Sequence, residues 1–143
     1  MLYTYDFIQR VQYVDTDQMG VMHNSNYFRF FEIGRNESMR NLGVMYKEVE
    51  QRGMMMPMVE QKCKYILPAY YDDLIIIRTS IDELPKAKFI FNYKLIRIEE
   101  NNKETEIAFG YNILAFIDKD TRKPRRCPEW ILDILEKNLV IKY

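Results

Sequence analysis

The chain has 143 residues, of which 48% are hydrophobic, 29% charged and 14% aromatic, and its 21 basic and 21 acidic side chains leave a net charge of zero. This composition excludes a disordered or collagen-like chain and predicts one domain over residues 1–143. A neutral chain is not expected to coat nucleic acid, which requires a basic surface. No apolar run approaches the ~20 residues that span a bilayer, and no signal peptide is recognisable. We therefore expect a cytoplasmic protein without a membrane span.

Two cysteines, Cys63 and Cys127, and one histidine, His23, restrict the chemistry open to the chain. Zinc sites need several His or Cys side chains at short spacing, which this sequence lacks. Without an export signal the cysteines are expected to be reduced. Neither has a neighbouring base that would make it a nucleophile.

The first third of the chain predicts a strand followed by a long helix. Strict alternation of apolar and polar residues over residues 3–13 is typical of a half-buried strand. Apolar residues then recur at spacings of three and four over residues 26–42, and Gly43 is a suitable residue to end that helix. Gly34 and Ser38 lie on the apolar side of the helix, where glycine costs about 1 kcal/mol relative to alanine. We expect these small residues to let the helix pack closely against a sheet.

The rest of the chain predicts a methionine-rich connector, four strands and a short helix. The connector covers residues 44–57, and the last helix is expected over residues 129–139. Turn residues, and no helix, separate the four strand candidates, which are residues 59–65, 73–81, 89–95 and 107–117. Strands with short connections form antiparallel meanders, so the order of elements predicts an α+β fold.

The segment YVDTDQMGVMHNSNY resembles the signature of the hotdog-fold acyl-CoA thioesterases. The resemblance is to the 4-hydroxybenzoyl-CoA thioesterase-like family, and within it to the subgroup of bacterial thioesterases associated with the Tol-Pal system. The signature has an acid, a second acid two residues later, a glycine three residues after that, and a tyrosine seven residues further on. These positions are occupied here by Asp15, Asp17, Gly20 and Tyr27.

The resemblance implies a fold, an assembly and a reaction. The fold is a five-stranded antiparallel sheet wrapped around one long helix. Two subunits pair, usually edge to edge into one sheet, with the active sites at their interface, so a homodimer or homotetramer is expected. The reaction is the hydrolysis of an acyl-CoA thioester to a free carboxylic acid and CoA, and it needs no metal or redox cofactor.

The same resemblance assigns the catalytic carboxylate to Asp17, as general base toward water or as nucleophile. The alternative interpretation is that Asp17 stabilises the turn or caps the following helix. Asp15 is expected to be a structural acid of the loop that hydrogen-bonds to the backbone.

The start of the predicted helix is a second candidate element. Unpaired N–H groups there carry partial positive charge and can polarise a thioester carbonyl, and the resemblance places the donor near His23 or Asn24. The His23 side chain either orients the thioester or the water, or faces solvent. Asn24 either shares that role or caps the helix, for which Ser25 and Asn26 are also suited. Tyr27 is expected to contact the substrate.

Basic side chains gather in two loops of the sequence. Lys86 and Lys88 follow a turn where related enzymes place the residues that meet the CoA phosphates, and residues 122–126 form a second cluster. Phosphate binding and a solvated loop stay open as interpretations of both. The methionines between residues 54 and 58 are expected to fill the core or an interface, with the lining of an acyl pocket as the alternative.

Two other functions fit these residues. An acyl-ACP thioesterase would act on acyl groups held by acyl carrier protein, and it would need a basic rim for that acidic partner. A non-catalytic acyl-CoA-binding module would need no base, so an intact Asp17 argues against it.

Overall fold

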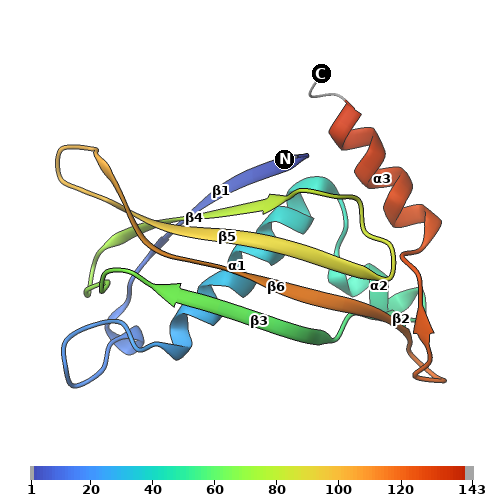
Figure 1. The fold of residues 1–143 in the computed structure, drawn as a ribbon, viewed down its shortest axis with the longest axis horizontal. Helices are drawn as coiled ribbons and strands as arrows, with labels where there is room; N and C mark the ends of the chain where they lie inside the picture. Colours follow the sequence, from blue (N-terminus) through green and yellow to red (C-terminus); the bar gives the residue numbers. More distant parts are fainter. Residues whose placement is uncertain (1, 141–143) are drawn as a thin grey trace.

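The computed structural model describes residues 2–140 of the chain (Figure 1). In chain order its elements are β1 (Tyr3–Arg10), the 3-10 turn η1 (Tyr13–Asp15), α1 (Ser25–Leu42), α2 (Tyr46–Gln51), β2 (Met54–Met55), β3 (Met58–Tyr65), β4 (Leu74–Ile81), β5 (Lys88–Ile98), β6 (Glu104–Asp118), β7 (Pro124–Arg125) and α3 (Glu129–Val140).

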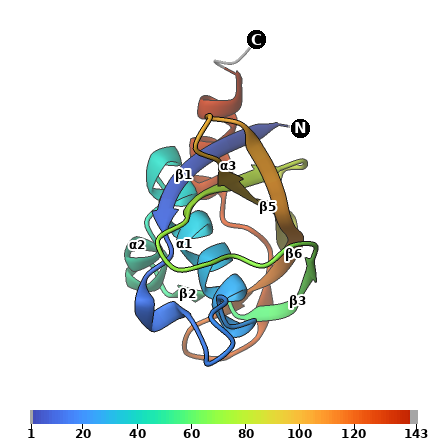
Figure 2. The ribbon, with the colours of Figure 1, turned by 90° about the vertical axis from the view of Figure 1, so that its left-hand side faces the viewer.

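The strands form one antiparallel sheet that curves around α1. The long strands follow the order β1-β4-β5-β6, and β3 and the two-residue strand β2 pair with the other side of β6. The two-residue strand β7 pairs with β6 on the side of β5, since Ile117 has Met55 of β2 as one partner and Pro124 of β7 as the other. Seen from one end, α1 lies inside the curve of the sheet (Figure 2). This is the predicted α+β hotdog fold with its five long strands. The short β2 and β7 were not predicted, since two residues carry no periodic pattern.

The first strand is shorter than its alternation predicts. Tyr3 and Val11 are buried as expected, but Tyr13 is 79% exposed. The backbone N–H of Gln12 donates to the Asp15 carboxylate, and the Asp15 N–H donates back to the Gln12 carbonyl. These bonds fold residues 13–15 into the turn η1, so the prediction of a strand through residue 13 was wrong there.

The methionine-rich connector contains the helix α2 and the strand β2. Val49 of α2 is fully buried, which holds this short helix on the core. Met54 and Met56 are also buried, as predicted for core filler, whereas Met58 at the start of β3 is 40% exposed.

α1 packs closely on the sheet through its small residues. A Cβ atom added to Gly34 would overlap Ile77 Cγ2 and stand 2.6 Å from Thr79 Oγ1, both on β4. Ser38 is buried and donates to the Gly34 carbonyl at 2.6 Å. Gly43 ends the helix in the left-handed conformation at φ +92°. The predicted close packing and helix end are both confirmed.

Among the residues described, no helix has the length and apolar character needed to cross a membrane.

Replacing Gly34 tests this close packing, because packing and helix propensity predict changes of opposite sign in the free energy of unfolding. Helix propensity alone would make Gly34→Ala stabilising by about 1 kcal/mol. The contact with Ile77 and Thr79 instead predicts a loss of about 1–3 kcal/mol in the free energy of unfolding, measured by urea denaturation. Asn36→Ala, at an exposed position of the same helix, is the matched control and should change the free energy by about 0.5 kcal/mol or less. A Gly34→Ala protein at least as stable as the wild type would contradict the packing argument.

Candidate active site

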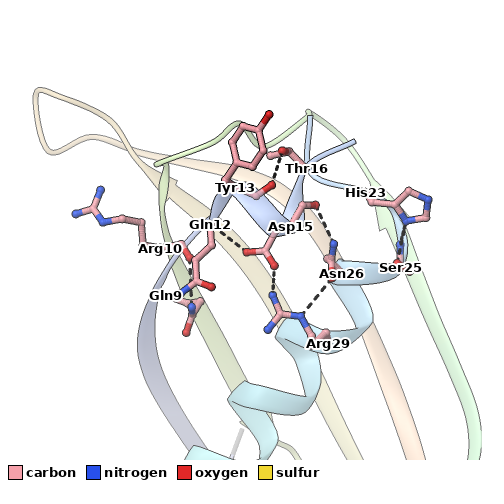
Figure 3. A network of polar contacts seen from close by, with 10 residues as sticks. All are labelled: Gln9, Arg10, Gln12, Tyr13, Asp15, Thr16, His23, Ser25, Asn26 and Arg29. Carbon is pink, nitrogen blue, oxygen red and sulfur yellow. Dashed lines mark hydrogen bonds and ion pairs between the residues drawn. The ribbon is translucent and has the colours of Figure 1, made fainter. Parts of the chain in front are cut away.

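The buried carboxylate of Asp15 ties the loop after β1 to the start of α1 (Figure 3). Asp15 is 1% exposed; one oxygen contacts the Arg29 guanidinium of α1, and the other accepts the N–H of Gln12 at 2.8 Å. Its backbone carbonyl accepts the His23 N–H at 2.9 Å and the Asn26 side-chain amide at 2.8 Å. A buried carboxylate is stable only when it is paired and hydrogen-bonded in this way. The expected bond from Asp15 to the backbone is present, and Asp15 has the contacts of a structural acid.

Asp17 lies in the loop that Asp15 anchors, and it is half-buried. Its N–H donates to the Val21 carbonyl at 3.0 Å, which closes the loop on itself. Its Oδ1 accepts the N–H of Met19 at 2.8 Å, as in an Asx turn. Its Oδ2 accepts no hydrogen bond from residues 2–140. One carboxylate oxygen therefore shapes the turn, and the other remains open to a water molecule or a substrate.

The start of α1 leaves one backbone donor without an acceptor in the described chain. The N–H of His23 binds Asp15, that of Ser25 donates to Nδ1 of the His23 ring at 3.2 Å, and the next two bind carbonyls of the same turn. The N–H of Asn24 has no such acceptor. Of the two predicted donor positions, His23 is occupied and Asn24 is open to a carbonyl oxygen.

The side chains at this helix start differ from the predicted caps. Asn24 is the N-cap residue but makes no side-chain cap bond, so the capping interpretation of its side chain does not hold. The exposed His23 ring caps the helix instead, through the Ser25 N–H and the Ser25 hydroxyl at 2.8 Å. Its side chain therefore has a structural partner, and a part in the chemistry stays a prediction.

Tyr27 lies in the core beneath the candidate site. It is 3% exposed, and its ring meets that of Tyr65 edge-on at 4.8 Å. The Tyr65 hydroxyl in turn donates to the Asn24 carbonyl at 3.3 Å, which links the end of β3 to the start of α1. Tyr27 supports the site from below, and direct contact with substrate stays a prediction. Burial raises the pKa of the adjacent Cys63 thiol to about 11, so this thiol is protonated at neutral pH.

Lys86 and Lys88 are exposed. They lie at the start of β5, and Figure 1 shows this end of β5 far from the loop between β1 and α1 that carries Asp17. The Lys86 carbonyl accepts the Cys127 N–H at 2.7 Å, so this turn lies beside the second predicted basic cluster. Lys88 is paired with Ala115, whose N–H binds the Pro57 carbonyl just before β3. The lysines thus lie at the start of β3, and Asn24 lies at its end. Eight residues of β3 separate the two groups by about 23 Å.

A pocket of about 810 Å³ opens along the outward face of α1, between that helix, the segment around Met56 and Met58, and strands β3 and β6. Sequence reasoning missed its polar lining on α1. Those side chains are Arg29, Glu32, Arg35, Asn36 and Arg40. Their spacing of three and four residues was the available signal for a second polar-lined face of the helix. Met56 and Met58 line this pocket, and a role of these methionines in holding an acyl group stays a prediction.

Within residues 2–140, no cluster of three or more His, Cys, Asp or Glu side chains is arranged to hold a metal ion.

Comparison with known proteins places the chain in a family. The model of the thioesterase-like superfamily matches residues 11–135. The acyl-CoA thioesterase YbgC of Haemophilus influenzae is 31% identical over 94 residues, which cover 65% of this chain and 69% of that protein. The acyl-CoA thioester hydrolase YbgC of Escherichia coli is 26% identical over 124 residues, covering 86% and 89%.

Solved structures share the fold. The 4-hydroxybenzoyl-CoA thioesterase of Pseudomonas sp. strain CBS-3 superposes with a TM-score of 0.80 at 21% identity, over 92% of this chain and 98% of that one. The chain therefore belongs to the thioesterase-like superfamily, as its signature predicted, and it is a thioester hydrolase with the hotdog fold. The narrower Tol-Pal subgroup stays a prediction.

Proposed function

We propose that this enzyme hydrolyses acyl-CoA to a free carboxylic acid and CoA, with Asp17 as the catalytic carboxylate. The proposal is carried by one observation: a carboxylate oxygen and a backbone donor, both without a hydrogen-bond partner in residues 2–140, lie at the two ends of the same anchored loop. These are Oδ2 of Asp17 and the N–H of Asn24. An antiparallel bridge pairs Thr16 with Met22, so the two ends of this loop lie side by side. Asp17, which follows Thr16, therefore lies beside the residues that lead into α1. The names of the YbgC relatives support acyl-CoA as the substrate.

The two groups supply complementary parts of the reaction. The thioester carbonyl accepts the Asn24 N–H at the positive end of α1, which stabilises the negative charge that develops on its oxygen. Asp17 takes a proton from a water molecule as that water attacks the carbonyl carbon. The tetrahedral intermediate then breaks its C–S bond and releases CoA as a thiolate. In the nucleophilic variant, Asp17 attacks first and water hydrolyses the resulting anhydride.

The distance between the two lysines, Lys86 and Lys88, and the loop of Asp17 supports a homodimer, either alone or within a homotetramer. A nucleotide held by Lys86 and Lys88 of the same chain would lie about 23 Å from the loop of Asp17. One edge of β3 has no partner strand among the described residues, and the strand is largely exposed. If β3 pairs antiparallel with its copy about a two-fold axis, the start of one strand lies beside the end of the other. The lysines of one chain then approach Asp17 and Asn24 of the other.

Hydrolysis of acyl-ACP is the second candidate, supported by the same exposed basic end. Lys86, Lys88, Lys123 and Arg126 form no ion pair within residues 2–140, so they are available to an acidic carrier protein as much as to CoA phosphates. Turnover of one acyl group on both carriers, at matched concentrations, decides between them.

Asp17→Asn tests the assignment of the carboxylate. The change keeps the shape and the bond to Met19 but removes the base, so kcat for thiol release should fall at least about 10²-fold. The melting temperature should change little, because the side chain is half-buried and unpaired.

Asp15→Asn is the contrasting variant for that experiment. In the amide, one of the two acceptor oxygens becomes an NH₂ group, which would face the donor of either Arg29 or Gln12 and lose that bond. The free energy of unfolding should therefore fall by about 1–3 kcal/mol. Near wild-type turnover in the Asp17→Asn enzyme would contradict the catalytic role of Asp17.

Asn24→Pro tests the backbone donor. Proline removes the N–H, and the φ of −57° at this position suits its ring. We expect kcat to fall by about 10²–10³-fold, as for the loss of an oxyanion donor. Asn24→Ala keeps the N–H and is the matched control, which should stay within a few-fold of wild type. Equal loss in both variants would assign the role to the Asn24 side chain instead.

Mixing two defective chains tests the shared site. Asp17→Asn removes the base, and Lys86→Ala/Lys88→Ala should raise KM for acyl-CoA several-fold by removing phosphate contacts. If one site combines both chains, a mixed dimer has one intact site, and random exchange restores about a quarter of wild-type sites. The two variants are unfolded together and refolded, so that their chains mix. The kcat/KM of this mixture should exceed the mean of the kcat/KM values of the two variants alone. A value equal to that mean would show that the two groups do not combine across the interface.

A further inference from the structure

A buried polar cluster lies between α1 and the sheet, away from Asp17. The Tyr93 hydroxyl donates to Asn112 Oδ1 at 2.8 Å, and both side chains are buried. Phe31 of α1 stacks on the Tyr93 ring with centroids 4.4 Å apart. Burial raises the pKa of Tyr93, and the Arg35 guanidinium beside it opposes that rise. Arg35, Tyr93 and Asn112 therefore form one cluster.

Two donors of this cluster have no acceptor. Nη1 of Arg35 and Nδ2 of Asn112 are buried, and neither makes a hydrogen bond with the described residues. Asn112 is only 1% exposed. A buried donor left unpaired destabilises the fold, and more so when it is charged. Both atoms can only donate, so the missing partner is an acceptor.

The unpaired donors lie at the pocket along α1. Arg35 lines that pocket directly, as do Gln61 and Leu114. Asn112 is the cross-strand partner of Gln61 in the pairing of β3 with β6, and it precedes Leu114 by two residues, on the same face of β6. Asn112 thus lies next to two lining residues, and the lining itself mixes charged side chains with apolar ones such as Met39, Met56 and Met58.

The charges around the pocket favour an anion. Arg29 is paired with Asp15, and Arg40 with Glu37, so these cations are already balanced. Arg35 and Lys47 have no ion pair among the residues described, and Glu32 is the one acid of the lining. Glu32 is exposed to water, which screens its charge, whereas the Arg35 Nη1 atom is buried.

We propose that this pocket takes an acyl group with a carboxylate at its far end, bound by Nη1 of Arg35 and Nδ2 of Asn112. This inference rests on the proposed acyl-CoA hydrolysis and names its substrate class as the ω-carboxyacyl thioesters. A carboxylate has two oxygens that only accept, which matches two unpaired donors, and its charge balances the guanidinium. The methionine-lined walls would hold the methylene chain between its two ends.

The helix also sets the length of this acyl group. Arg35 follows Asn24 by eleven residues, which places its Cα about 16 Å further along the axis of α1. Side chains on a helix lean toward its N-terminus, so the guanidinium returns part of that distance. A chain longer than succinyl is therefore needed to join the two points.

The test compares three matched thioesters at each length from succinyl to sebacoyl. They are the ω-carboxyacyl-CoA, its ω-methyl ester and the plain acyl-CoA of equal length, assayed by thiol release. We expect kcat/KM to favour the carboxylate over the ester by at least about tenfold at the best length. Arg35→Gln should bring that ratio close to one, and Arg35→Lys should retain part of it. Arg78→Gln, at an arginine that pairs with Asp6 and lies outside the pocket lining, is the matched control and should keep the full ratio.

Binding separates failure of this inference from failure of the proposed function. The same ligands are titrated by calorimetry into the Asp17→Asn protein. Turnover of acyl-CoA without a preference for the carboxylate would overturn this inference alone. A carboxylate preference in Kd, lost in Asp17→Asn/Arg35→Gln, with no turnover by the wild type, would support the pocket and overturn the hydrolytic function. A preference unchanged by Arg35→Gln in a folded protein would also overturn the inference, since a second copy or water then satisfies these donors.

Discussion

The buried charge of Asp15 is the constraint on which the rest of the candidate site depends. Its carboxylate needs donors because it is out of water, and Gln12 and Arg29 provide them from opposite sides of the loop. This fixes where β1 ends and where α1 begins. Because the Asp15 carbonyl also takes the His23 N–H, the donor left open at the helix start is that of Asn24. The structural acid thereby selects both the position of Asp17 and the identity of the candidate oxyanion donor, although it need not touch the substrate.

Sequence predicted the parts of this arrangement that depend on periodicity or on the signature. The long strands, the helix with Gly34 toward the sheet, and the bond from Asp15 to the backbone all followed from the residues or their resemblance. The rest depends on contacts that no local pattern encodes. Tyr13 leaves the sheet because Asp15 folds the chain back, and the His23 ring caps α1 because the loop presents its Nδ1 to Ser25. The polar cluster joins Arg35 on α1 to Asn112 on β6, and only the fold brings these residues together.

The two ends of β3 are the reason for proposing that the site is shared between two copies of the chain. Tyr65 at its end contacts the Asn24 carbonyl, whereas its start lies next to the strand that carries Lys88. A rigid strand cannot bring its own ends together, so a substrate that needs both groups must span the sheet or meet two chains. The exposed edge of β3 offers backbone groups that water or another strand must satisfy. Pairing with a second copy would satisfy this edge and assemble the site in one step, which ties catalysis to oligomeric state.

The close packing of α1 on one side has a consequence on the other. Because Gly34 has no side chain, the helix approaches Ile77 and Thr79 of β4 to a distance that any other residue would prevent. The opposite face of α1 looks toward β3 and β6, where the gap is lined by adaptable methionines and by Gln61 and Leu114. Because α1 packs tightly on β4, it leaves space on the side of β3 and β6. Gly34 therefore affects the width of the pocket along α1 without lining it, because a larger residue there would move α1 away from β4 toward β3 and narrow the space beside Arg35.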